Sequence, residues 1–72
     1  MQIRIGRNLK EAETATDAIN LIKESALEVT NEYQVDAEFD EVEQRKICRF
    51  FHQSKNTILD LHFSFFTVRF FS

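Results

Sequence analysis

The sequence predicts an α+β domain in which one long amphipathic helix packs on a small sheet. Apolar residues recur at helical spacing between about Thr14 and Tyr33. Apolar and polar residues alternate, as in strands, over Met1–Ile5 and again over much of 57–71. The chain has 72 residues, no proline and a single glycine, so no linker is visible. We therefore expect residues 1–72 to form one domain.

The N-terminal strand is short. Met1, Ile3 and Ile5 alternate with polar residues, and Gly6 lies near the predicted end of the strand. Alternation over Tyr33–Phe39 predicts a second strand, which we expect to pair with the first.

The helix over about Thr14–Tyr33 is the clearest element. Its N-cap is predicted at Thr14 or Thr16, with Asp17 near the positive end of the helix dipole. One apolar stripe is expected to face the core: Ala15, Ala18, Ile19, Ile22, Ala26, Val29 and Tyr33. The opposite face collects Glu13, Asp17, Asn20, Glu24, Glu28, Asn31 and Glu32.

A change of pattern at Asp40 predicts a second helix. The sequence Asp-Glu-Val-Glu resembles a capping box, which would open a helix reaching about Gln53. A helix throughout 36–53 is the main alternative, and it would replace the strand predicted before Asp40.

The C-terminal stretch 57–71 is predicted to be one strand. The alternation changes phase after Phe65 and Phe66, which we interpret as a bulge because no turn residue is present for a hairpin. So apolar a strand should lie centrally in its sheet or be covered by another chain. The predicted core or dimer residues are Leu59, Leu61, Phe63, Phe65, Phe66, Val68 and Phe70.

Charge is distributed unevenly along the chain. The formal net charge is −3, yet residues 1–10 carry three basic side chains and no acidic one. Residues 11–43 contain eleven of the twelve acidic residues and one basic residue, and only Asp60 is acidic in 44–72. Such segregation bears on association and on the choice of partner.

The acidic helix face is the leading candidate site. Glu24, Glu28 and Glu32 repeat at i,i+4 without basic residues at the neighbouring positions, although such like-charge pairs destabilise a helix. We expect this face to bind a basic surface of a partner protein, through Asp17, Glu24, Leu27, Glu28 and Glu32. Regulation or inhibition would follow from occlusion, or from mimicry of nucleic acid. The chain is similar in charge and size to small acidic inhibitors of phages and other mobile elements, without a shared family motif.

Two other functions remain open. Arg45, Lys46 and Arg49 lie close to aromatic residues, a combination that can bind single-stranded nucleic acid. The neighbouring acidic segment would repel phosphates, so nucleic acid is the less favoured partner. The third possibility is a structural oligomeric subunit, whose Phe-rich strand completes the sheet of a neighbour.

Residues with catalytic or metal-binding chemistry do not form a convincing constellation. Cys48, His52 and His62 lack the paired spacing of zinc sites. Asp60, His62 and Ser64 would share a strand face, but alternate residues are about 6.6 Å apart along a strand, too far for a hydrogen-bonded triad. One glycine cannot form a phosphate-binding loop. We therefore expect no enzyme activity, no catalytic residues, no metal and no cofactor.

The remaining expectations concern oligomeric state and location. A chain of this size buries little apolar surface, and one cysteine cannot form an internal disulfide, so a homodimer is expected. The same cysteine usage and the lack of a leader sequence predict a cytoplasmic protein. Residues 57–71 include three polar or charged side chains and are too few to span a bilayer, so no membrane association is expected.

Overall fold

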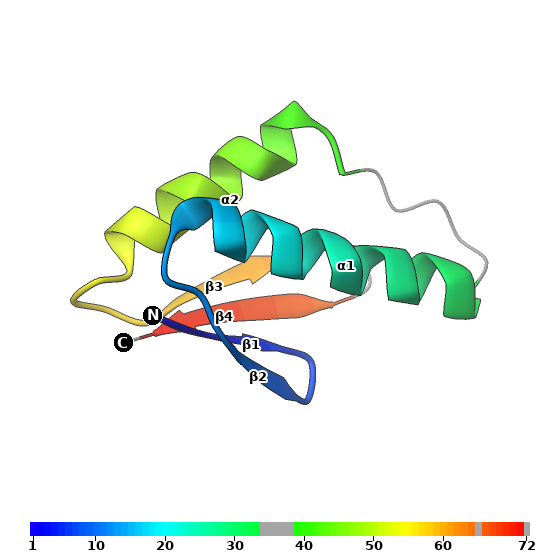
Figure 1. Ribbon diagram of the computed structural model, residues 1–72, viewed down its shortest axis with the longest axis horizontal. Coiled ribbons are helices and arrows are strands. Elements are labelled where there is room, and N and C mark those ends of the chain that lie inside the picture. Colours follow the sequence, from blue (N-terminus) through cyan, green and yellow to red (C-terminus); the bar gives the residue numbers. More distant parts are fainter. Residues whose placement is uncertain (34–38, 65, 72) are drawn as a thin grey trace.

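The protein consists of a four-stranded antiparallel sheet with both helices on one of its faces (Figure 1). The computed structural model describes residues 1–33, 39–64 and 66–71. The order of elements along the chain is β1 (Gln2–Ile5), β2 (Asn8–Glu11), α1 (Ala15–Tyr33), α2 (Glu41–Gln53), β3 (Leu59–His62) and β4 (Thr67–Phe71). The predicted α+β class is confirmed, and the two chain ends lie close together (Figure 1).

The strands are ordered β2-β1-β4-β3, so β1 and β4 are central. Paired residues lie on the same face of a sheet, and the register places Ile3 opposite Phe70 and Ile5 opposite Val68. These four side chains are buried beneath the helices, as is Leu61 of β3. The central position predicted for the end of the chain is therefore confirmed for β4.

The helices supply the other half of the core. Ala18, Ile22 and Ala26 of α1 are buried, as predicted from the helical repeat. From α2, Ile47 and Phe51 are buried against the same cluster. The side chains of Val29 and Tyr33, also predicted for this stripe, lie outside the described part of the structure.

Two capping arrangements explain where the helices begin. The Thr14 hydroxyl accepts a hydrogen bond from the Asp17 amide (3.1 Å), and the Asp17 carboxylate accepts one from the Thr14 amide (3.3 Å). This reciprocal pair is a capping box, and it selects Thr14 over Thr16 as the N-cap. At α2, the Asp40 carboxylate accepts from the Glu43 amide (3.1 Å), so the predicted start of that helix is confirmed.

The prediction of one bulged strand over 57–71 is wrong. The chain reverses between β3 and β4, which pair in antiparallel fashion with Leu59 opposite Phe70 and His62 opposite Thr67. The amide of Phe63 donates to the carbonyl of Phe66 (2.8 Å) and helps to close the reversal. The phase change in the sequence therefore marks a hairpin, made without a glycine or proline.

The predicted pairing of Tyr33–Phe39 with β1 is also wrong. Tyr33 ends α1, and 34–38 lie outside the described residues. Both sides of β1 are taken, one by β2 and the other by β4. Strand β2 was not predicted, because all four of its residues are exposed and only Leu9 is apolar. Its hairpin with β1 turns through Gly6, whose φ of +60° favours glycine.

The face of the sheet opposite the helices is not covered by any element in the described part of the chain (Figure 1). Arg4 of β1 lies there, between Leu9 of β2 and Arg69 of β4. Arg69 in turn faces Asp60 and donates two hydrogen bonds to its carboxylate, at 2.8 and 3.1 Å. We call this side of the sheet the open face.

The hydrogen bonds from Arg69 hold the pKa of Asp60 below its usual value. The contribution of the pair to stability is present above the ordinary aspartate pKa of about 3.9 and is lost as the pH falls through the lower folded pKa. An NMR titration of the Asp60 carboxyl should show this low pKa, and Arg69→Gln should raise it. Equal values in the two proteins would contradict the assignment.

Candidate functional site

The outward side of α1 carries the candidate site. Because Ala18, Ile22 and Ala26 are buried, the helix must present its other side to solvent, and Glu24, Glu28 and Glu32 are exposed there. A helix rises 1.5 Å per residue, so successive members of this set are about 6 Å apart along the axis. We call Glu24, Glu28 and Glu32 the acidic row.

The three carboxylates of the acidic row have no counter-charge in the described part of the chain. No lysine, arginine or N-terminal amine lies within 4 Å of them, and they accept no hydrogen bonds there. The last turn of α1 also contains no basic residue to offset the negative end of the helix dipole. The acidic row is therefore an uncompensated line of negative charge.

Asp17 differs from the other predicted binding residues. Its carboxylate accepts hydrogen bonds from the amides of Glu13 and Thr14, both at 3.3 Å. These bonds hold the carboxylate at the start of the helix, about one and a half turns or more from the acidic row. Asp17 therefore has a structural role as a cap, and it can add negative charge to the face only from its end.

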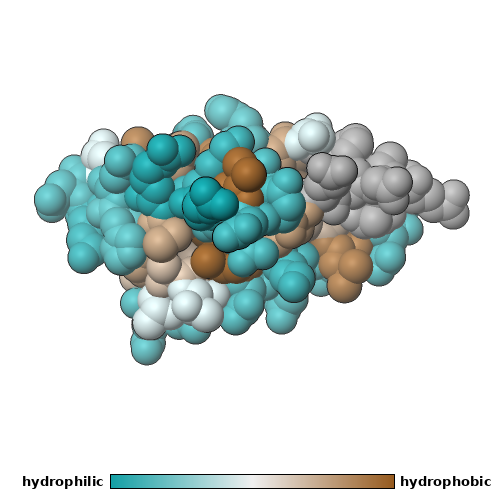
Figure 2. Space-filling view, turned by 90° about the horizontal axis from the view of Figure 1, so that it is seen from above, coloured by the Kyte–Doolittle hydropathy of each residue, from teal (hydrophilic) through white to brown (hydrophobic). Residues whose placement is uncertain are grey.

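Leu27 supplies an apolar contact beside the acidic row. It is 61% exposed, a large fraction for a leucine. From the helix side, hydrophilic residues cover most of the surface that the structure describes, and hydrophobic residues appear between them (Figure 2). An exposed leucine among unpaired carboxylates is suited to contact with another protein.

The acidic row should weaken the isolated fold. Each like-charge i,i+4 pair costs about 0.2–0.5 kcal/mol, and an oppositely charged pair contributes a similar gain. We expect Glu28→Lys to raise the free energy of unfolding by about 0.5–1 kcal/mol, because it replaces two repulsions by two attractions. Urea unfolding of the two proteins measures the difference. A decrease in stability would show that Glu28 makes a favourable contact within the chain.

The second predicted surface, on α2, is more nearly neutral. Arg45 lies 3.5 Å from Glu41, and Lys46 lies 3.7 Å from Glu43. Together with Arg49 and the half-exposed Val42, these cations line a shallow hollow of about 320 Å³.

The aromatic residues of α2 do not extend this surface. Phe51 is buried, and the half-buried Phe50 packs with its ring centroid 6.0 Å from that of Phe70. They belong to the core, so they cannot offer a stacking platform to nucleic acid bases.

The apolar residues near the C-terminus divide between core and surroundings. Leu61, Val68 and Phe70 are buried within this one chain. Leu59, Phe63 and Phe66 are half-buried, and the Phe63 and Phe66 rings stack with centroids 4.9 Å apart. Phe65 lies outside the described residues. Of the two roles predicted for this set, the structure accounts for the core role.

The side chains considered for metal or catalytic chemistry have other partners. His62 Nδ1 lies 3.0 Å from the Thr67 hydroxyl, and His52 packs edge-on against Phe51. Asp60 pairs with Arg69, as described above. Among the residues that the structure describes, no three His, Cys, Asp or Glu side chains gather as a metal site would require.

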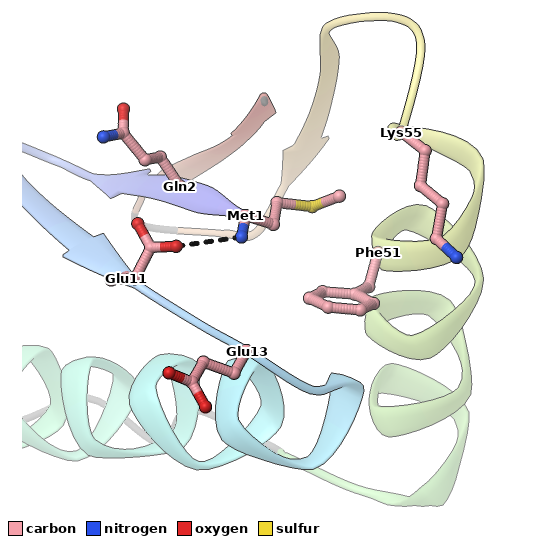
Figure 3. Close-up of a pocket in the computed structure, with 6 residues that line it drawn as sticks. All are labelled: Met1, Gln2, Glu11, Glu13, Phe51 and Lys55. Carbon is pink, nitrogen blue, oxygen red and sulfur yellow. Dashed lines mark hydrogen bonds and ion pairs between the residues drawn. The ribbon is translucent and has the colours of Figure 1, made fainter.

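A hollow of about 650 Å³ lies beside the start of β1, lined by Met1, Gln2, Glu11, Glu13, Phe51 and Lys55 (Figure 3). The N-terminal amine pairs with the Glu11 carboxylate at 3.0 Å and also donates to the carbonyl of Ala12. Sequence analysis did not find this hollow, because its residues come from separate elements that only the fold brings together. Its charges are mixed and largely paired, so it gives no indication of a ligand.

Comparisons with protein-family models, curated proteins and solved structures found no match. Neither helix, over the part of the chain that the structure describes, is long and apolar enough to cross a membrane. The functional argument therefore depends on the geometry of this chain.

Proposed function

We propose that the protein is a small acidic interaction module that regulates or inhibits a partner protein with a basic surface. The observation that carries this proposal is the acidic row, three exposed carboxylates without counter-charges beside the exposed Leu27. A basic partner would neutralise them and remove the repulsion along the helix. The mechanism is steric and electrostatic occlusion, without bond chemistry.

A nucleic-acid-binding protein is the partner class that best fits this charge. Such proteins present lysine and arginine to the phosphate backbone. A rigid helix with regularly spaced carboxylates can occupy the same groove as a mimic of that backbone. We place this activity in the cytoplasm, as expected for a chain with one unpaired cysteine. We also propose that the chain acts as a homodimer, because small domains commonly gain stability by association.

A pull-down from the native host tests the proposal. Wild-type protein should recover a basic partner, and a Glu24→Lys/Glu28→Lys/Glu32→Lys variant should lose it. A Glu41→Gln/Glu43→Gln variant serves as a control, since it removes acidic charge from α2 and leaves the acidic row intact. Added DNA should release the partner if the helix occupies a nucleic-acid groove. Equal recovery by the wild type and the lysine variant would place the contact elsewhere.

Direct binding of nucleic acid is the second candidate function. It is favoured only by Arg49, which forms no ion pair within the described residues, and by the neighbouring pair Arg45 and Lys46. A gel-shift assay with single- and double-stranded oligonucleotides separates the two functions. A shift that disappears in Arg45→Gln/Arg49→Gln would favour this candidate over the leading one.

A further inference from the structure

The open face of the sheet carries a second charged surface, opposite in sign to the acidic row. Arg4 and Leu9 lie side by side on β1 and β2, and Arg69 faces Arg4 from β4. Arg7 lies in the turn that joins β1 to β2. We call Arg4, Arg7, Leu9 and Arg69 the basic sheet surface.

This surface has more positive than negative charge. Arg69 is paired with Asp60, but Arg4 contacts only the ring of Phe71, at 6.0 Å from the centroid. Arg7 forms no ion pair within the described chain. Like charges directly opposite each other on adjacent strands are destabilising, so the Arg4–Arg69 pair has a cost that an incoming carboxylate would relieve.

The basic sheet surface also has room and apolar area for a contact. A hollow of about 420 Å³ lies beside Arg4, Asp60 and Arg69. Leu9 is 55% exposed, nearly as much as Leu27 beside the acidic row. Each of the two surfaces therefore combines unpaired charge of one sign with one exposed leucine.

We propose that the basic sheet surface of one copy of this chain binds the acidic row of a second copy. Within one chain no ion pair joins the two surfaces among the described residues, so both remain unsatisfied there. Between two chains, Arg4 and Arg7 meet Glu24 and Glu28, and Leu9 meets Leu27. Charge complementarity selects this occupant over a second acidic or a second basic surface.

The contact is head-to-tail, because it joins two different surfaces. Such an interface leaves one acidic row and one basic sheet surface free in a dimer, and it can continue into longer chains or rings. The inference rests on the proposed function, since both use the acidic row. A second copy then competes with the basic partner and limits the amount of free inhibitor.

Mixing two neutralised variants tests this arrangement. Arg4→Gln/Arg7→Gln removes the unpaired charge of the basic sheet surface, and Glu24→Gln/Glu28→Gln removes most of the acidic row. By sedimentation velocity, the wild type should form species that grow with concentration beyond two chains, and each variant alone should stay monomeric. An equimolar mixture should form a complex of one chain of each variant and stop there, because the remaining surfaces are neutralised.

The control variant is Lys10→Gln/Glu41→Gln. Lys10 is also on β2 but is paired with the buried Ile3, so it lies on the helix side of the sheet. This variant should associate like the wild type. A monomeric wild type, or a mixture that associates no better than its components, would overturn the inference. In either case the host partner can still be lost on neutralising the acidic row, so the two proposals fail separately.

Discussion

Phe70→Ala is expected to lower the free energy of unfolding by about 3–5 kcal/mol, the usual cost of truncating a buried phenylalanine. Phe70 is fully buried on the central strand β4, opposite Ile3 and in ring contact with Phe50. A domain of 72 residues has a total stability of about 4–11 kcal/mol, from roughly 0.05–0.15 kcal/mol per residue. The variant should therefore be partly or largely unfolded at room temperature, as urea denaturation or circular dichroism would show.

Phe71→Ala provides the matched control. Phe71 is the next residue along β4, but it faces the open side of the sheet and is only half-buried. We expect a clearly smaller loss, arising from partial exposure and the contact with Arg4. Equal losses for the two variants would mean that the inner face of β4 is not the one that packs on the helices.

The second large effect concerns binding. For a partner recovered from the host, Glu24→Lys/Glu28→Lys/Glu32→Lys should weaken affinity by at least about a hundredfold, since three attractions become three repulsions. Most of the loss should appear in the association rate constant, because exposed charges steer the encounter of two proteins. Surface plasmon resonance measures both rate constants.

Leu27→Ala separates the apolar part of the contact from the electrostatic part. It should leave the association rate constant nearly unchanged and increase the dissociation rate constant, because a short-range packing contact acts after the encounter. If the lysine variant instead changes only the dissociation rate constant, the carboxylates do not steer association.

The helices were predictable because their determinants are local. The stripe through Ala18, Ile22 and Ala26 follows from a period of 3.6 residues, and the caps at Thr14 and Asp40 follow from side chains three residues apart. Such signals need no knowledge of the rest of the chain.

The sheet was only partly predictable, since its pairing is non-local. Strand β2 is an exposed edge strand with little apolar content, so its pattern resembles that of a loop. The reversal between β3 and β4 contains no proline or glycine, and the phase change there is equally compatible with a bulge.

The candidate site divides in the same way. The acidic row could be predicted because three glutamates on one helix share a face at fixed spacing. The capping role of Asp17 and the basic sheet surface could not. The register that places Arg4 beside Leu9 and Arg69 joins residues from both ends of the chain, which sequence spacing does not reveal.

The salt dependence of partner binding tests the central claim most directly. Because the acidic row is exposed, raising the ionic strength from about 0.01 to about 1 M shortens the screening length from about 30 to about 3 Å and should weaken its attraction to a basic surface. We expect the association rate constant for the wild type to fall steeply over this range and that for the glutamine-substituted row to change little. An association rate constant of the wild type that is independent of salt would contradict the account.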